Sequence, residues 1–275
     1  MGFLREIDHG GRLISVWLTI PSARPASEIK ERLERWRDMG YKIALWRNGP
    51  HVDDSIECDW LFSRPDYHGW GASINFIIER VAEYDPTADW FLGGGDDTDP
   101  DPTKRAEDIA QECSEHFYDE VLEIWQSLPV SERRATPAFA RWFGVMQPTG
   151  DRWGADEPWA KAMFPDAPAY IDRICGSPWI GRSFAERAHS GAGPFHPDFF
   201  HMFADESLLE YAKMLGVLWQ RRDLIHFHDH PRRDGIPRTP DFAAATGIYG
   251  SEEWERGKAI LARLKAEKFA SCLPK

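Results

Sequence analysis

The sequence lacks a positive charge excess, a paired-cysteine motif and any long apolar run. Its 45 Asp and Glu outnumber 33 Lys and Arg, giving a formal net charge of -12. This charge weighs against broad binding of nucleic acid, which depends on neutralising phosphates. The four cysteines are scattered without a Cys-x-x-Cys pair, so we expect reduced, structural thiols in a cytoplasmic protein. No apolar run approaches the ~20 residues that span a bilayer, and residues 1–11 lack the apolar core of a signal peptide, so we expect no membrane partner.

Internal repeats and low-complexity linkers are also absent from the 275 residues, which favours one composite domain over two. The hydrophobic share of 42% and the charged share of 28% are typical of a globular chain that can bury a core. Thirteen tryptophans are many for this length. Most should lie in the core, but Trp also supplies flat apolar surface on which sugars and bases stack.

The first half of the chain alternates apolar runs with helical patterns. Leu13 to Ile20 is almost wholly apolar, as in a buried parallel strand, and Ser27 is placed to cap the helix that follows. The same patterns predict strands at 42–46, 58–62 and 89–93 and helices at 71–84 and 103–126. This alternation predicts an α/β fold with an open, mostly parallel, twisted sheet flanked by helices.

The second half is less regular, with many Pro, Gly and aromatic residues between 155 and 197. Such a composition indicates loops with short helices. We predict strands at 142–146 and 223–230, a helix that begins at Asp205 and a last helix at about 251–268.

An acidic stretch, Asp96 to Pro102, follows the strand predicted at 89–93 and three glycines; it contains no Lys or Arg. Its carboxylates would repel one another without a cation or hydrogen-bond donors, and they suit Mg²⁺ or Mn²⁺. Because open α/β sheets bind ligands outside the carboxyl ends of their strands, the stretch predicts a metal-bridged phosphate site. A solvated turn or a helix start is the alternative. A calcium loop fits less well, because Pro102 stands where that loop needs Gly.

Two further groups could carry chemistry. His226, His228 and His230 alternate along a predicted strand and so share one face, where an imidazole could complete a carboxylate metal site. The alternatives are a half-exposed strand, or a zinc hydrolase, for which no His-Glu-x-x-His motif is present. Asp205 is either a helix N-cap or a general base at the rim of a pocket.

Together these residues resemble glycosyltransferases of the GT-A fold, whose nucleotide-binding half ends in a DxD motif, often Asp-x-Asp-Thr-x-Pro-Asp-Pro. Residues 95–102 overlay this motif with Asp97 as the second acid, whereas Gly95 replaces the first. The division of roles among Asp96, Asp97 and Asp99 stays open. The segment 67–75 resembles the helix start beside the donor in this group, and the late histidines resemble its third metal ligand.

The resemblance covers about residues 13–231 and implies one GT-A-like domain over residues 1–275. Its nucleotide-sugar-binding half is about 12–102 and its acceptor-side half about 103–240, followed by a C-terminal helix in 241–275. The runs 178–182 and 200–203 resemble small phage-type members, some of which decorate modified bases in viral DNA. A phage-encoded enzyme of this kind would work in the host cytoplasm.

The resemblance also implies site residues. It assigns donor binding to Pro21, Ser22, Arg24, Arg47, Asn48, Gly71, Asn75, Asp96 and Asp97. It assigns acceptor or sugar contacts to Asp151, Trp153, Trp179 and Arg182. It implies Mn²⁺ or Mg²⁺ held by Asp97, with Asp99 or Asp96, and by His226 or His228. It gives the catalytic acids as Asp205 and Glu206, with inversion if Asp205 is the base and retention if Asp205 is only a cap.

The implied reaction moves a sugar from a nucleotide-sugar donor, uridine-linked by the habit of the family, to an acceptor hydroxyl. Three acceptors are open: a hydroxymethylated pyrimidine in phage DNA, a glycan and a small molecule. The acidic total disfavours DNA, whereas the arginine pairs at 133–134, 221–222 and 232–233 favour it. The rival functions are a nucleotidyltransferase, whose Gly-rich loop is missing from residues 21–25, and a noncatalytic Ca²⁺-dependent carbohydrate-binding module.

Overall fold

The computed structural model describes residues 14–52, 55–127, 142–152, 169–229 and 250–273. The strands are β1 (Ser15–Ser22), β2 (Lys42–Arg47), β3 (Trp60–Ser63), β4 (Ala88–Gly93), β5 (Thr98–Asp99), β6 (Val145–Pro148), β7 (Trp179–Gly181), β8 (Leu218–Arg221) and β9 (Phe227–His228). The α-helices are α1 (Ala26–Asp38), α2 (Trp70–Tyr84), α3 (Ala106–Ser127), α5 (Arg182–Arg187), α6 (Ala204–Met214) and α8 (Ser251–Ala266). The short 3₁₀ turns are η1 (Gly49–His51), η4 (Tyr170–Arg173), η5 (Ala188–Gly191) and η6 (Ala270–Cys272).

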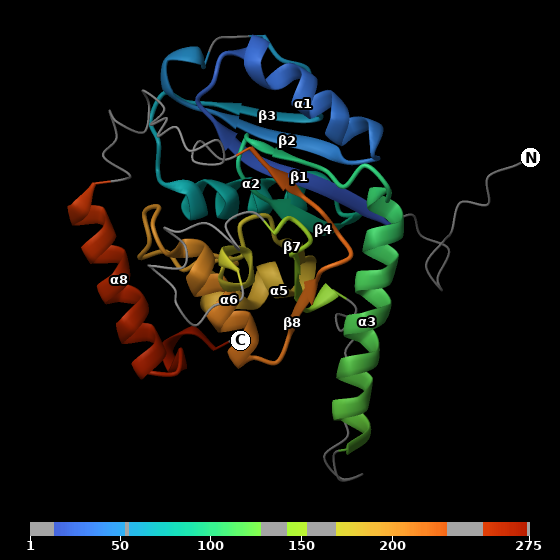
Figure 1. The fold of residues 1–275 in the computed structure, drawn as a ribbon, viewed down its shortest axis with the longest axis vertical. Coiled ribbons are helices and arrows are strands. Elements are labelled where there is room, and N and C mark those ends of the chain that lie inside the picture. The colour runs from blue at the N-terminus through green and yellow to red at the C-terminus, as the bar shows by residue number, and fades with distance from the viewer. Residues whose placement is uncertain (1–13, 53–54, 128–141, 153–168, 230–249, 274–275) are drawn as a thin grey trace, which may run out of the picture.

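One seven-stranded sheet runs through both halves of the chain in the order β3-β2-β1-β4-β7-β6-β8. Strands β1 to β4 pair in parallel, β7 is antiparallel to both of its neighbours, and β8 is parallel to β6. Helices α1 and α2 lie on opposite sides of β1 and β2 (Figure 1). The predicted α/β fold, with an open and mostly parallel sheet flanked by helices, is therefore confirmed.

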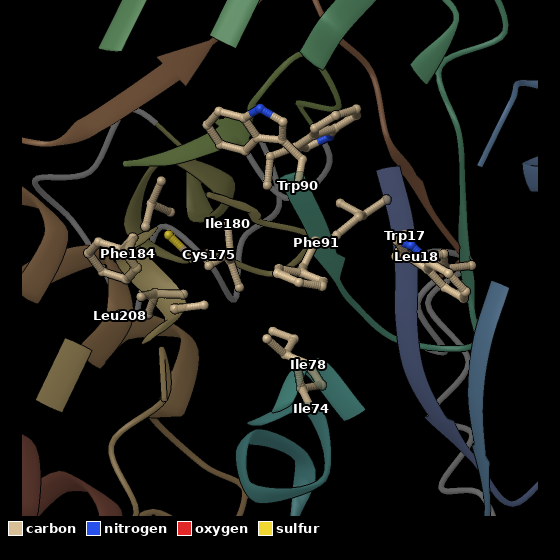
Figure 2. Packing of buried hydrophobic residues seen from close by; sticks show 14 of the residues in the cluster. Trp17, Leu18, Ile74, Ile78, Trp90, Phe91, Cys175, Ile180, Phe184 and Leu208 are labelled. Atoms are coloured by element: carbon tan, nitrogen blue, oxygen red, sulfur yellow. The ribbon is translucent and has the colours of Figure 1, made fainter. Parts of the chain in front are cut away.

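The core follows from the apolar patterns of the strands and helices. All eight residues of β1 are buried, as expected for a central parallel strand covered on both faces. Helix α1 buries Ile29, Leu33 and Trp36, the predicted helical stripe. Figure 2 shows Ile74 and Ile78 of α2 facing Phe91 of β4. Burying side chains of this size contributes ~1.5–3 kcal/mol each to the stability of the fold. The sheet and the helices packed on it therefore form the stable core of the molecule.

A buried carboxylate, that of Asp85, links β1 and β2 by hydrogen bonds at the edge of the sheet where β1, β2 and β4 begin. Asp85 lies between α2 and β4, and its Oδ2 accepts hydrogen bonds from Ser15 Oγ (3.2 Å), Trp17 Nε1 (3.0 Å) and Lys42 Nζ (2.8 Å). Its Oδ1 accepts from the backbone N–H of Thr87 at 2.9 Å. Burial alone would raise the pKa of Asp85, but the donated hydrogen bonds outweigh it and hold the pKa well below its usual range.

We expect Asp85→Asn to lower the free energy of unfolding by about 2 kcal/mol at pH 7, because several charge-assisted hydrogen bonds are weakened together. The depressed folded-state pKa means that this contribution is complete above the ordinary Asp value of about 3.9 and is lost as pH falls below it. Urea unfolding at pH 7 and at pH 3 measures both effects. The difference between wild type and variant should shrink at pH 3, while the exposed Asp38→Asn control should change little at either pH. A difference that is the same at both pH values would contradict this account.

The structure corrects several predicted elements. Ser27 lies inside α1, and Pro25 occupies the N-cap position. The strand predicted at 223–230 is not continuous: β8 ends at Arg221, and of the described residues in that range only Phe227 and His228 form a strand. Strands β7 and β8 were not predicted, since each is short and lacks a clear alternation. None of the helices described is both long and apolar enough to cross a membrane.

Candidate functional site at the carboxyl edge of the sheet

The carboxyl ends of β1, β2, β4, β6 and β8 meet at one edge of the sheet, because β7 alone runs the other way. The strand order also reverses between β1 and β4: β2 and β3 lie on one side of β1, whereas the later strands β7, β6 and β8 lie beyond β4 on the other. Open α/β sheets form a ligand crevice at such a reversal. The predicted site residues that follow these strands are therefore brought to one place.

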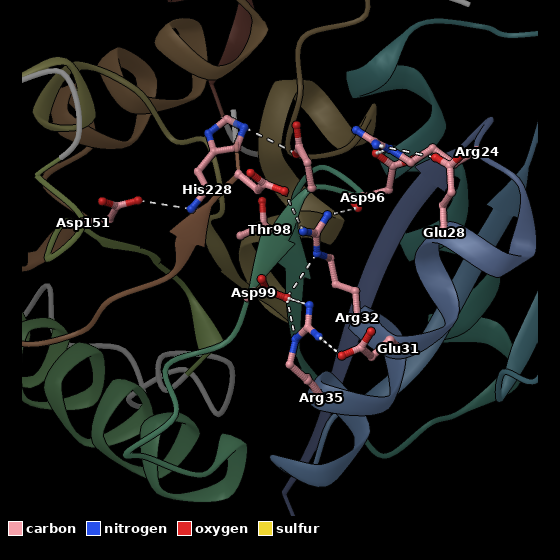
Figure 3. Close-up of polar contacts among 12 residues, drawn as sticks. Arg24, Glu28, Glu31, Arg32, Arg35, Asp96, Thr98, Asp99, Asp151 and His228 are labelled. Atoms are coloured by element: carbon pink, nitrogen blue, oxygen red, sulfur yellow. Dashed lines mark hydrogen bonds and ion pairs between the residues drawn. The ribbon is translucent and has the colours of Figure 1, made fainter. Parts of the chain in front are cut away.

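Asp97 and His228 lie together at this edge. The turn after β4 places Asp97 directly before β5, and β5 pairs with β9 so that Thr98 is opposite His228 (Figure 3). The backbone oxygen of Asp97 accepts the N–H of Asp229 at 2.8 Å. His228 Nε2 is 3.3 Å from Asp97 Oδ1, close to the roughly 3 Å that separates adjacent ligands of a metal bound at about 2.1 Å. A carboxylate oxygen and an imidazole nitrogen at this separation could hold a divalent cation.

The loop after β6 fixes the backbone of the histidine. Asp151 Oδ2 accepts the N–H of His228 at 3.1 Å, and Gly150 donates its N–H to the carbonyl of Leu224 at 2.8 Å. Asp151, assigned to a sugar contact, thus borders the Asp97–His228 pair. Its contact with a sugar stays a prediction.

Asp96 joins the end of β1 to the end of β4. Its carboxylate accepts hydrogen bonds from Ser22 Oγ at 2.6 Å and Arg24 Nε at 3.0 Å. Burial raises the pKa of Asp96; Arg24 opposes that shift and the neighbouring Asp97 adds to it. Three residues predicted to bind the donor (Ser22, Arg24 and Asp96) therefore form one hydrogen-bonded group across the reversal point.

The end of β2 adds two more of the predicted donor residues. Arg47 and Asn48 are buried, at 0% and 1% exposure. Arg47 Nη2 donates to the carbonyl of His51 at 2.7 Å, and the N–H of Asn48 donates to the carbonyl of Ser22 at 3.0 Å. Asn48 Oδ1 is buried and accepts no hydrogen bond from the described residues. A buried amide oxygen without a donor is costly, and an N–H of a bound base would satisfy it.

Two of the four predicted metal ligands have other partners. Asp99 Oδ1 accepts hydrogen bonds from Arg32 Nε (3.1 Å) and Arg35 Nη2 (2.8 Å), so this carboxylate faces α1 (Figure 3). His226 Nδ1 is 3.2 Å from Ser177 Oγ, and its ring meets Trp36 edge-on at 5.3 Å. Burial lowers the pKa of His226 to about 3. Of the three histidines predicted to share a face, His226 is buried, His228 is half-buried with its Nε2 3.3 Å from Asp97 Oδ1, and His230 lies outside the described residues.

The structure gives packing roles to two residues that the resemblance assigned to the donor. Gly71 lies where an added Cβ would come within 2.8 Å of Phe195 Cβ, so this glycine permits α2 to pack closely. Asn75 Oδ1 accepts the N–H of Phe195 at 3.0 Å, and its Nδ2 donates to the carbonyls of Ala192 and Phe195 at 3.1 and 2.7 Å. The Asn75 amide therefore fixes the loop 192–195, and its assignment to donor binding stays a prediction.

Two predicted acceptor contacts are structural as well. Trp179 is fully buried in β7 and meets Tyr41 edge-on at 5.6 Å. Arg182 directly follows the last residue of β7 and donates hydrogen bonds to the carbonyls of Ala82, Pro86 and Ala88, near the start of β4. That position is at the edge of the sheet away from Asp97. Trp153 lies outside the described residues.

The acidic pair Asp205 and Glu206 lies in the first turn of α6. Phe203, not Asp205, occupies the N-cap position, with a left-handed φ of 67°. Asp205 Oδ1 accepts the N–H of Glu206 at 3.1 Å. Burial, and then the charge of Asp205, raises the pKa of Glu206 well above its usual range. Burial and a neighbouring carboxylate therefore disfavour the ionised form of Glu206.

His201 interacts electrostatically with both Asp205 and Asp97. It was not assigned to the site from the sequence. Burial lowers its pKa, while the charges of Asp205, then Glu253, then Asp97 act in the opposite direction, so its ring lies within electrostatic reach of both acids. Its Nδ1 is 2.9 Å from the hydroxyl of Tyr67. A cavity of about 430 Å³ opens beside Glu206, with Tyr170, Arg173 and Phe203 in its wall.

Arg32 was also missed. Its Nη1 donates to the backbone oxygen of Asp96 at 2.9 Å, and its Nη2 pairs with Asp229 at 3.1 Å. It thereby ties the acidic turn to the segment that carries His228. The available signal was the spacing of Arg32 and Arg35, three residues apart on a helix that follows the first predicted strand.

Comparison with known proteins found no matching family model and no matching curated protein. The catalytic domain of Drosophila beta1,4-galactosyltransferase 7, solved with xylobiose, is similar in structure with a TM-score of 0.45 and 11% sequence identity over 83% of this chain and 76% of that chain. A glycosyltransferase involved in the glycosylation of the major capsid of PBCV-1 has a TM-score of 0.29 and 15% identity over 61% of this chain and 60% of that chain. Both are glycosyltransferases, the class whose motifs this sequence resembles.

Proposed function

We propose that this chain is a metal-dependent glycosyltransferase that uses a nucleotide-sugar donor, uridine-linked, and Mn²⁺ or Mg²⁺. The observation that carries the proposal is the Asp97–His228 pair, with 3.3 Å between His228 Nε2 and Asp97 Oδ1, at the carboxyl edge of a sheet whose order reverses there. A divalent cation held by this pair would neutralise the charge on the leaving diphosphate. Asn48 and the group formed by Ser22, Arg24 and Asp96 would hold the nucleotide.

On the acceptor side, Asp205 would take the proton from the attacking hydroxyl, which implies inversion at the anomeric carbon. Asp205 is half-buried in the first turn of α6, and burial together with its charge raises the pKa of the neighbouring Glu206. Two carboxylates that a Ca²⁺ loop would need already have other partners. Asp99 pairs with arginines, and Asp101 accepts hydrogen bonds from the backbone N–H groups of Thr103 and Ile225.

Donor binding tests this function directly. We expect UDP-sugars with Mn²⁺ to raise the melting temperature by several degrees, because a ligand that binds only the native state stabilises it by mass action. Neither Mn²⁺ with free monosaccharide nor Ca²⁺ with a glycan panel should match this shift. Stabilisation by Ca²⁺ and glycan, with none by any nucleotide, would replace the enzyme by a binding module.

For the acceptor we propose a hydroxymethylated pyrimidine in phage DNA, on the resemblance of the segments 178–182 and 200–203. Within the described residues the arginine pairs give little support for DNA as the acceptor, because Arg221 is buried in ion pairs with Glu112 and Asp223. Mass spectrometry of hydroxymethylated DNA, a glycan panel and a small-phenol panel, each incubated with mixed UDP-sugars and Mn²⁺, identifies the substrate. A mass increase on glycan or phenol alone would remove DNA as the acceptor.

A further inference from the structure

A second group of metal-ligating side chains lies where three separate segments meet. His189 comes from η5, His196 from the loop that follows it and Cys272 from the C-terminal turn η6. One ligand atom of each lies within 4.8 Å of the corresponding atoms of the other two. Because 83 residues separate His189 from Cys272 in the chain (272 minus 189), the folded structure alone brings them together.

His189 is a buried imidazole without an evident structural use for its nitrogens. It is 6% exposed, and neither ring nitrogen makes a hydrogen bond of good geometry with the described residues, although the Pro194 carbonyl is near enough to favour ring protonation. Its ring stacks on Tyr211 at 4.3 Å and meets His196 edge-on at 5.0 Å. Burial lowers the pKa of His189 to about 3, so the ring is neutral at physiological pH, the form that binds metals.

The backbone holds this imidazole in place. His189 and the next residue, Ser190, have left-handed φ values of 49° and 60°, a conformation that costs a non-glycine residue ~1 kcal/mol or more. The hydroxyl of Tyr211 accepts the N–H of His189 and donates to the carbonyl of Cys272. One tyrosine thus positions both an imidazole and the segment that carries the thiol.

The two other side chains are also arranged as ligands. Cys272 is 2% exposed, and burial raises the pKa of its thiol, so a cation is what would favour the thiolate there. Asp198 Oδ2, which accepts a hydrogen bond from Arg263 Nη2 at 2.7 Å, is 4.0 Å from His196 Nδ1; a shift of either side chain would let this carboxylate accept the second ring N–H of a metal-bound histidine. In that tautomer His196 Nε2 is the ligand atom, and the bond from the backbone N–H of Asp198 to Nδ1 is exchanged for one to the carboxylate.

We propose that His189, His196 and Cys272 bind one Zn²⁺ ion, with water in the fourth position, and that this ion fastens the C-terminal turn to the body of the protein. Two imidazoles and a thiolate suit Zn²⁺ and not the Mg²⁺ or Mn²⁺ expected at Asp97. Tetrahedral Zn²⁺ places its N and S ligands roughly 3.3–3.6 Å apart. Ligand atoms at the 4.8 Å limit would therefore have to approach by about 1.2–1.5 Å when the ion binds.

Metal analysis of the purified chain tests this site without any assay of sugar transfer. We expect about one equivalent of Zn²⁺ per chain, and reconstitution of the chelated protein with Co²⁺ should give the intense near-ultraviolet band of a cobalt–thiolate bond together with tetrahedral visible bands. An octahedral cobalt spectrum without the thiolate band, from a protein that remains folded, would overturn the proposal.

Matched variants locate the ion. Cys272→Ser and His189→Phe, the latter keeping a ring to stack on Tyr211, should each lower the Zn²⁺ affinity at least about 100-fold. Cys58→Ser removes a half-buried thiol in the N-terminal part of the chain. Both this variant and Asp97→Asn should retain one equivalent of Zn²⁺. If Cys272→Ser keeps its zinc, or if Asp97→Asn loses it, the assignment fails, and neither result bears on whether the chain transfers sugar.

Discussion

Asp97→Asn should lower the rates of UDP-sugar hydrolysis and of sugar transfer by about 1,000-fold, which corresponds to about 4 kcal/mol of transition-state stabilisation. The substitution keeps the shape of the side chain but removes the negative charge that holds the cation. His228 alone, 3.3 Å away, would then have to hold it. Initial rates at saturating Mn²⁺, with circular dichroism to confirm the fold, measure the effect.

Asp99→Asn is the matched control for this prediction. It stands two residues further along the same acidic stretch, but its carboxylate pairs with Arg32 and Arg35 on α1. We expect a modest loss of stability and a change of less than about 10-fold in rate, since partly exposed ion pairs contribute ~1 kcal/mol or less. If Asp99→Asn were the more damaging change, the metal would have to be assigned to Asp99 instead of Asp97.

His228 allows an independent check on the same pair. His228→Ala should mainly raise the Mn²⁺ concentration needed for half-maximal rate, because a neutral ligand contributes affinity while the charge of Asp97 remains. The rate should recover at high Mn²⁺ in this variant and not in Asp97→Asn. Equal rescue of both variants would show that Asp97 acts through shape alone.

The resemblance, and not the spacing of the residues, paired Asp97 with His228, which stands 131 positions later (228 minus 97) on β9, antiparallel to β5 and outside the seven-stranded sheet. The strand-end rule placed only Ser22, Arg24 and the acidic stretch at one edge of the sheet. It could not rank Asp97 against Asp99, because that depended on the arginines of α1 turning toward Asp99.

The structural partners of several predicted site residues could not be read from the sequence. Asn75 and Arg182 are polar residues that donate hydrogen bonds to backbone groups far away in sequence, the carbonyls of Phe195 and Ala88 among them. Backbone carbonyls are present at every residue, so composition and spacing carry no information about which one a side chain will meet. The burial of Trp179 was hidden for a related reason, since its run of three strand residues gave no period from which to infer burial.

The second large effect on the rate of sugar transfer is expected from the acidic pair on α6, Asp205 and Glu206. We expect Asp205→Asn to lower kcat/KM for sugar transfer by 10²–10⁴-fold, the usual contribution of a positioned general base, with donor binding by thermal shift unchanged. Glu206→Gln should stay within about 10-fold of wild type. Burial and the charge of Asp205 raise the pKa of Glu206 well above its usual range, so the amide of Gln resembles the neutral form that this position favours.

Stability measurements separate these roles from any effect on folding. A carboxyl whose pKa is raised in the folded state costs no stability below its ordinary value of about 4.3 and destabilises the fold progressively as pH rises above it. Glu206→Gln should therefore leave the free energy of unfolding unchanged near pH 4 and raise it at pH 8. Asp205→Asn removes the charge that raises the Glu206 pKa, so it should lose activity without losing stability at pH 8. A variant pair with these effects exchanged would make Glu206 the base and Asp205 its neutral neighbour.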